Sequence, residues 1–196
     1  MEKYYLYIVL TRTSTIISRL IRFFKKDDYT HAAISLDKKL KVMYSFARKA
    51  PYNPLIGGFM QERLDKGIYK LHRELPGKIL EVEVSEEQYQ KAKSLLEHFV
   101  DYRHLYGYNY MGLLHSLNRT AVCYDNRFLC SEFVYYILKE SGIADLNKPR
   151  NLVRPQNLLA LESRIVYEGN LKNLLPPERR TNTGLWGRLS ALYEQI

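Results

Sequence analysis

The stretch RFLCSEFVYYILKESG, residues 127–142, predicts a helix with a cysteine at its start. Its apolar residues recur at steps of three and four, which is typical of a helix that buries one face. These residues are Phe133, Val134, Ile137 and Leu138. Gly142 fits the position that follows a helix C-cap. We therefore expect this helix to pack in the core, with Cys130 at its N-terminus.

Cys130 has two interpretations. It lies on the apolar face, where a free cysteine often acts as a small buried hydrophobe. A thiol at a helix N-terminus also faces unpaired N–H groups and the positive end of the helix dipole, and both lower its pKa. The same N–H groups can stabilise a developing oxyanion. The helix alone leaves both interpretations open.

A nucleophilic thiol needs a base, and His31 is the natural candidate. It begins the predicted strand HAAISLD, residues 31–37, directly after DDYT. His31 taken alone is also compatible with an ordinary satisfied histidine. The other four histidines are expected at the surface or in satisfied positions; they are His72, His98, His104 and His115.

The rest of the chain mixes β and α patterns. Strands are predicted at 4–11, 31–37, 41–47, 67–72, 78–85 and 164–169. Helices are predicted at 14–24, 85–100, 106–117, 127–142, 154–163 and 185–196. Residues 48–65, with two prolines and a Gly-Gly pair, are expected to be irregular. This order predicts an α+β fold with an antiparallel sheet and packed helices.

Composition restricts the function only loosely. The chain has 196 residues and 30 basic against 21 acidic side chains, hence a net charge of +9. A basic surface favours anionic partners, but the positive residues are scattered and no nucleic-acid motif is found. Two cysteines make a disulfide framework or a zinc site unlikely to form. The N-terminal apolar run is too short for a signal peptide, and no segment is long enough for a membrane span, so a cytoplasmic location is expected.

Two segments together resemble a known family. The run YTHAAISLD, residues 29–37, resembles a histidine strand, and FLCSEFVYYIL, residues 128–138, resembles a cysteine helix. With the histidine first, they resemble the permuted papain-like superfamily, namely the YiiX-like branch of the NlpC-type cysteine peptidases. That branch is related to lecithin retinol acyltransferase-like enzymes. The similarity covers roughly residues 4 to 162, and RPQNLLAL, residues 154–161, resembles a helix that often follows.

The resemblance implies a circularly permuted papain-like domain over residues 1–170, followed by a C-terminal extension over 171–196. It implies that Cys130 is the nucleophile and His31 the general base. The family usually places a third polar residue, commonly Glu, on the strand after the histidine. Here that position falls near Ser45, which brings no charge.

The residues beside the implied dyad are candidates for the substrate site. Tyr29 and Thr30 precede His31, and Ser131 follows Cys130. The resemblance implies a cysteine amidase, peptidase or acyltransferase that forms an acyl-enzyme and needs neither metal nor cofactor. A peptide, a muropeptide or an acyl lipid would be the substrate. The alternative is a non-catalytic peptide- or lipid-binding module whose basic surface, with the 185–196 helix, docks on an anionic membrane or a partner; nucleic-acid binding is not expected.

Overall fold

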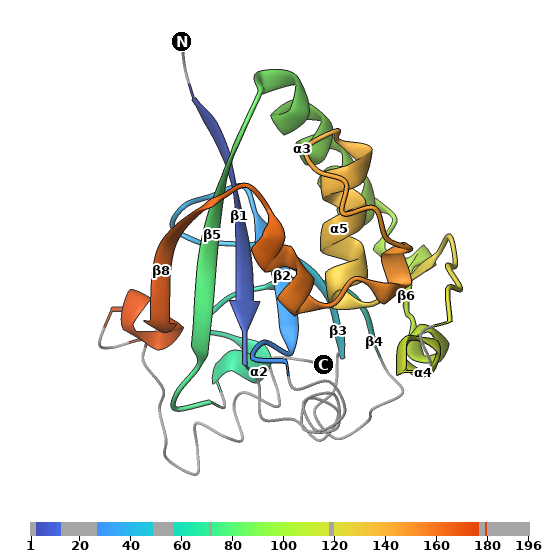
Figure 1. The fold of residues 1–196 in the computed structure, drawn as a ribbon. Coiled ribbons are helices and arrows are strands. Elements are labelled where there is room, and N and C mark those ends of the chain that lie inside the picture. The colour runs from blue at the N-terminus through green and yellow to red at the C-terminus, as the bar shows by residue number, and fades with distance from the viewer. Residues whose placement is uncertain are drawn as a thin grey trace.

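Eight strands form one open sheet in the computed structural model, in the order β7-β6-β4-β3-β2-β1-β5-β8 (Figure 1). Neighbouring strands are antiparallel, except for β6 and β7, which run parallel. The structure describes residues 3–12, 27–48, 57–70, 72–117, 120–176 and 179. With helices packed on this sheet, the chain is an α+β protein, as the sequence pattern predicts.

Strand β1 (Tyr4–Thr11) is buried along most of its length, between β2 (His31–Ser35) and β5 (Pro76–Val84). Alternate side chains of β1 enter two different apolar clusters, one on each face of the sheet. This burial on both faces explains its nearly continuous run of β-forming residues. The register places Thr11, the last residue of β1, opposite His31, the first residue of β2.

The predicted hairpin between β2 and β3 (Met43–Arg48) is confirmed, and its turn contains no glycine. Leu40 adopts the left-handed conformation there, with a φ of 50°. The Asp37 carboxylate accepts the backbone N–H of Lys39 at 2.9 Å, and the Asp37 carbonyl accepts that of Leu40 at 2.9 Å. The Asp37 side chain therefore stabilises this turn, in which no glycine is present.

Two sequence predictions in the next segment are wrong. Residues 48–65 were predicted to be irregular, yet they contain strand β4 (Gly57–Glu62), which pairs with β3 along its whole length and buries Phe59. Residues 67–72 were predicted to be a strand, yet they contain a short helix, α2 (Gly67–Lys70). Gly67 takes a φ of 54°, so the chain turns there and directs Tyr69 into the core. Tertiary packing overrides local propensity in both cases.

Helices α3 (Glu86–Asp101) and α5 (Cys130–Glu140) lie side by side on one face of the sheet (Figure 1). The predicted Ser85–Gln88 capping box begins α3. The larger apolar cluster fills the space beneath the helices, with close ring contacts that join β3, β4, α3 and α5. The rings are those of Phe46, Phe59, Phe99, Phe128 and Phe133. This packing fixes where α5 begins relative to the strands.

The connection between α3 and α5 is made of short elements. They are η1 (Arg103–Leu105), β6 (Gly107–Tyr108), α4 (Tyr110–Leu117) and β7 (Arg127–Phe128). After α5 come η2 (Arg150–Leu152) and η3 (Pro155–Ala160). The helix predicted at 154–163 is thus a 3₁₀ segment, begun by Pro155, whose missing N–H is tolerated in a first turn.

The opposite face of the sheet carries a smaller cluster that includes Tyr7, Met43, Tyr69 and Leu171. Strand β8 (Arg164–Asn170) is confirmed as the last strand, and η4 (Leu171–Leu174) follows it. Leu171 and Lys172 are buried, so the described start of the C-terminal extension packs on the sheet. The helices predicted at 14–24 and 185–196 fall outside the described residues. No helix in the described ranges combines the length and apolar composition that a membrane crossing needs.

Candidate active site

Cys130 is the first residue of α5 and is only 8% exposed. The residue before it, Leu129, is extended, and its N–H donates to the Glu132 carboxylate at 3.1 Å. The backbone N–H groups of Ser131 and Ala32 face the Cys130 sulfur. Cys130 therefore lies where the predicted helix N-terminus can stabilise a thiolate.

Two neighbours of Cys130 hold the start of α5 in place. The Ser131 hydroxyl donates to the carbonyl of Val153 at 2.6 Å, so this predicted substrate-site side chain holds the loop after η2. Glu132 is fully buried and accepts from Asn109 Nδ2 and Arg150 Nε, each at 3.1 Å. Burial raises the pKa of Glu132, against the opposing effect of these donors. Its carboxylate ties α5 to α4 and η2.

The structure brings His31 and Cys130 together, although 99 residues separate them in the chain. Each of the two side chains shifts the pKa of the other, so the imidazole and the thiol are electrostatic neighbours. His31 Nε2 lies 3.0 Å from Glu62 Oε2, which leaves Nδ1 as the ring nitrogen for the thiol. The imidazole thus lies between a thiol and a carboxylate.

The electrostatics of this cluster favour an ion pair. Burial acts to lower the pKa of His31, but the Glu62 carboxylate and the Cys130 sulfur outweigh it and raise that pKa well above 6.5. Burial acts to raise the pKa of the Cys130 thiol, but His31 and the two backbone N–H groups lower it overall. An imidazolium stabilises a thiolate, and each charge favours the other.

Glu62 is the residue that the sequence interpretation missed. It is the last residue of β4, is 6% exposed, and accepts a second hydrogen bond from the Tyr69 hydroxyl at 3.1 Å. The local signal was weak, because the six residues GGFMQE of this strand do not alternate apolar and polar side chains. The prolines and glycines before it favoured an irregular segment.

Ser45, the predicted third residue, is not the partner of the imidazole. It lies in β3 opposite Met60, is fully buried, and its hydroxyl has no hydrogen-bond partner among the described residues. The charged partner of His31 comes from the next strand of the sheet. The sequence prediction placed the third residue on β3, the strand next to His31, whereas the carboxylate lies on β4.

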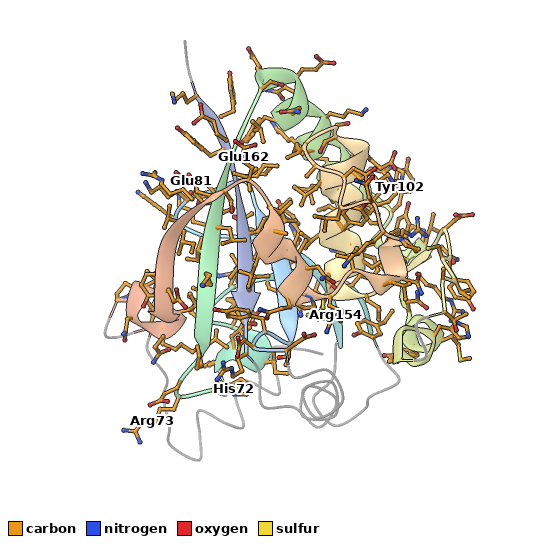
Figure 2. The ribbon with its side chains drawn as sticks, viewed as in Figure 1. His72, Arg73, Glu81, Tyr102, Arg154 and Glu162 are labelled. Carbon is orange, nitrogen blue, oxygen red and sulfur yellow. The ribbon has the colours of Figure 1, made fainter. Side chains whose placement is uncertain are left out.

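Tyr29 and Thr30 are both buried beside His31, and Tyr29 belongs to the larger apolar cluster. The segment that carries them is anchored at several points. The Thr30 N–H donates to Thr11 at 2.9 Å, the Asp28 N–H donates to Gln156 at 3.2 Å, and Arg154 pairs with Asp27 at 2.6 Å. Figure 2 shows Arg154 near the end of the sheet where α5 begins. These anchors fix the approach to His31.

The other histidines have different surroundings. His98 Nε2 lies 2.9 Å from the Tyr106 hydroxyl at the surface, and burial lowers the pKa of His72. Both cysteines are free thiols, and Cys123 is exposed. Within the described ranges, no three His, Cys, Asp or Glu side chains are grouped as metal ligands.

A cavity of about 630 Å³ lies elsewhere, between the start of β1, the far end of β5 and the start of β8. Glu81 and Glu162 are among its lining residues (Figure 2). None of its lining residues belongs to the cluster around Cys130. We locate the candidate chemistry at Cys130 rather than at this cavity, because four of the five charged side chains that line the cavity form two ion pairs, Lys3 with Glu83 and Arg164 with Glu81.

Comparisons of the chain with protein-family models, with curated proteins and with solved structures find no match. The case for this site rests on its own geometry.

Proposed function

We propose that the protein is a cysteine hydrolase, an amidase or peptidase, or an acyltransferase, that uses Cys130 as nucleophile and His31 as general base and acid. One observation carries the proposal: the His31 imidazole lies 3.0 Å from the Glu62 carboxylate and interacts electrostatically with the Cys130 thiol, whose pKa it lowers. A nucleophile, a base within reach and an acid that orients the base are the three parts of a catalytic triad.

The chemistry follows from the protonation states. The proton of the thiol resides on His31, and the sulfur attacks the carbonyl carbon of an amide or ester. The tetrahedral intermediate collapses when His31 donates its proton to the leaving nitrogen or oxygen, which gives a thioester on Cys130. His31 then removes a proton from water or an acceptor, which attacks the thioester and releases the thiol. Backbone N–H groups at the start of α5 are oriented to stabilise the oxyanion.

Glu62 orients the imidazole and stabilises its positive charge. The Nε2–H···Oε2 hydrogen bond selects the tautomer that leaves Nδ1 free to accept the thiol proton. A buried carboxylate does this more effectively than an exposed one because the surrounding dielectric constant is low. Glu62 thus has the role that the sequence analysis assigned to the vicinity of Ser45.

The arrangement supports the permuted papain-like interpretation. The histidine strand precedes the cysteine helix in the chain, and that helix packs on an antiparallel sheet. We propose a peptide, a muropeptide or an acyl lipid as substrate. The proposal includes both hydrolysis, in which water attacks the thioester, and acyl transfer, in which another acceptor does.

The alternative, a non-catalytic binding module, had one argument in its favour, namely the absence of an acid beside His31. Glu62 removes that argument. The module would bind anionic vesicles in a salt-sensitive manner, and Cys130→Ala would leave that binding unchanged.

The test is the pH dependence of Cys130 alkylation by iodoacetamide, with Cys123 replaced by Ser throughout. We expect a thiolate that titrates well below about 8.5. His31→Ala should raise this pKa by about 1 to 3 units, the usual effect of one close opposite charge. A thiol pKa near the ordinary value that does not respond to His31→Ala would refute the proposal.

A further inference from the structure

The Glu62 carboxylate has a second hydrogen-bond donor, the Tyr69 hydroxyl, which donates to the same oxygen as His31. Glu62 Oε2 lies 3.0 Å from His31 Nε2 and accepts the Tyr69 hydroxyl at 3.1 Å. We propose that Tyr69 is a positioning residue of this site, which holds the Glu62 carboxylate in place while His31 exchanges a proton with Cys130. This inference rests on the proposed function and assigns the site a fourth residue.

Tyr69 is well suited to this role because it is 2% exposed and its ring packs against the site. The centroids of the Tyr69 and His31 rings are 6.3 Å apart. Burial and the neighbouring Glu62 charge raise the pKa of Tyr69 well above 10. The phenol therefore stays protonated throughout the neutral range and remains a hydrogen-bond donor to the carboxylate.

Two donors on one carboxylate oxygen hold the carboxylate in place. They restrict its rotation, so the direction of its hydrogen bond to His31 is fixed. A fixed carboxylate in turn keeps the imidazole oriented toward Cys130.

The backbone around Tyr69 is held from the far end of the chain. Lys172 is buried and donates from Nζ to the carbonyl of Leu64 at 2.9 Å, in the turn between β4 and α2. Glu62 and Tyr69 lie on the two sides of this turn. The first residues of the C-terminal extension therefore support the segment that carries both side chains.

The chain contains a matched control in Tyr7. Its hydroxyl donates to Glu81 Oε2 at 3.2 Å, and both residues are buried, at 5% and 4% exposed. Tyr7 and Tyr69 belong to the same apolar cluster. Glu81, however, pairs with Arg164 and not with a histidine. Tyr7→Phe thus removes an equivalent hydrogen bond without touching the site.

The experiment measures the pH profile of Cys130 alkylation in a Cys123→Ser background. The variants are Tyr69→Phe, Glu62→Gln, the double variant Tyr69→Phe/Glu62→Gln, and Tyr7→Phe. We expect Tyr69→Phe to raise the thiol pKa by half a unit to one unit, and so to slow alkylation below that pKa by about threefold to tenfold. Tyr7→Phe should leave the profile unchanged.

The double variant tests whether Tyr69 acts through Glu62. If it does, adding Tyr69→Phe to Glu62→Gln changes the profile no further, whereas an independent effect would be additive. A Tyr69→Phe profile equal to wild type, or a shift that persists in the Glu62→Gln background, would overturn the inference. Tyr69→Met, which also lacks a donor, repeats the test if the Phe variant does not fold.

The same data separate this inference from the proposed function. If His31→Ala does not move the thiol pKa, the proposed function fails. If His31→Ala and Glu62→Gln both move it and Tyr69→Phe does not, only the role of Tyr69 fails.

Discussion

Glu62 and Glu81 are two buried carboxylates that each accept a hydrogen bond from a tyrosine but pair with different basic residues. Each is at most 6% exposed and accepts a hydrogen bond from a buried tyrosine, Tyr69 or Tyr7. Glu62 pairs with His31, whereas Glu81 pairs with Arg164. Glu81, which is labelled in Figure 2, lies opposite Tyr7 in the sheet. His31 lies opposite Thr11, farther along β1.

The difference lies in whether the partner can lose its proton. Arginine stays charged at every relevant pH, so the Glu81–Arg164 ion pair between β5 and β8 does not depend on the protonation of Arg164. Histidine exchanges its proton near neutrality, and His31 also contacts a thiol. Each cluster has its own carboxylate and its own tyrosine. The titratable histidine makes the cluster around Glu62 a candidate active site.

Replacing each carboxylate by its amide is the strongest way to break this comparison. Glu62→Gln should raise the Cys130 thiol pKa by about 1 unit or more, because a close negative charge no longer stabilises the imidazolium. Alkylation at pH 6.5 should then fall about tenfold. Glu81→Gln should leave alkylation unchanged and lower the free energy of unfolding by about 1 kcal/mol. Equal alkylation profiles for the two variants would contradict the distinction.

Lys172 extends the comparison to a buried basic group whose hydrogen-bond partner, the Leu64 carbonyl, carries no formal charge. Burial lowers its pKa from 10.5 to about 8, only partly offset by Asp65. The folded protein loses this proton first, so its stability should rise with pH between 8 and 10.5. Relative to Lys172→Met, the wild-type free energy of unfolding should increase by about 3 kcal/mol over this range. Chemical denaturation at each pH measures it, and a constant difference would refute the prediction.

Glu81 should show a dependence of the same sign at acidic pH, with the smallest effect of the three. Burial acts to raise the pKa of Glu81, but Arg164 and Tyr7 outweigh it, and the pKa lies below 4.5. Its contribution to stability is present above 4.5 and is lost as pH falls through the lowered pKa. Wild type should therefore lose a few tenths of a kcal/mol relative to Glu81→Gln upon acidification. Unfolding curves at pH 5 and pH 3 test this, and a difference that grows at pH 3 would contradict it.

The residues with the clearest local signals were predicted correctly as elements. The spacing of Phe133, Val134, Ile137 and Leu138 predicted α5, and the cap residues Ser85 and Gln88 predicted α3. Strand β4 was missed because prolines and glycines dominate its N-terminal side and its own residues, GGFMQE, do not alternate apolar and polar side chains. Helix α2 was mistaken for a strand because Ile68 and Tyr69 are β-formers, while the turn at Gly67 depends on packing.

By itself, the sequence determined that the protein is α+β, that a thiol begins a helix and that a histidine begins a strand. Local periodicity and capping are properties of neighbouring residues, so they can be read along the chain. Only the tertiary structure decided that His31 and Cys130 interact electrostatically, that the hydrogen-bond partner of His31 is Glu62 rather than Ser45, and that Tyr69 shares the same carboxylate oxygen. These contacts join strands and helices across the sheet, and their geometry depends on register and side-chain direction, which no local pattern specifies.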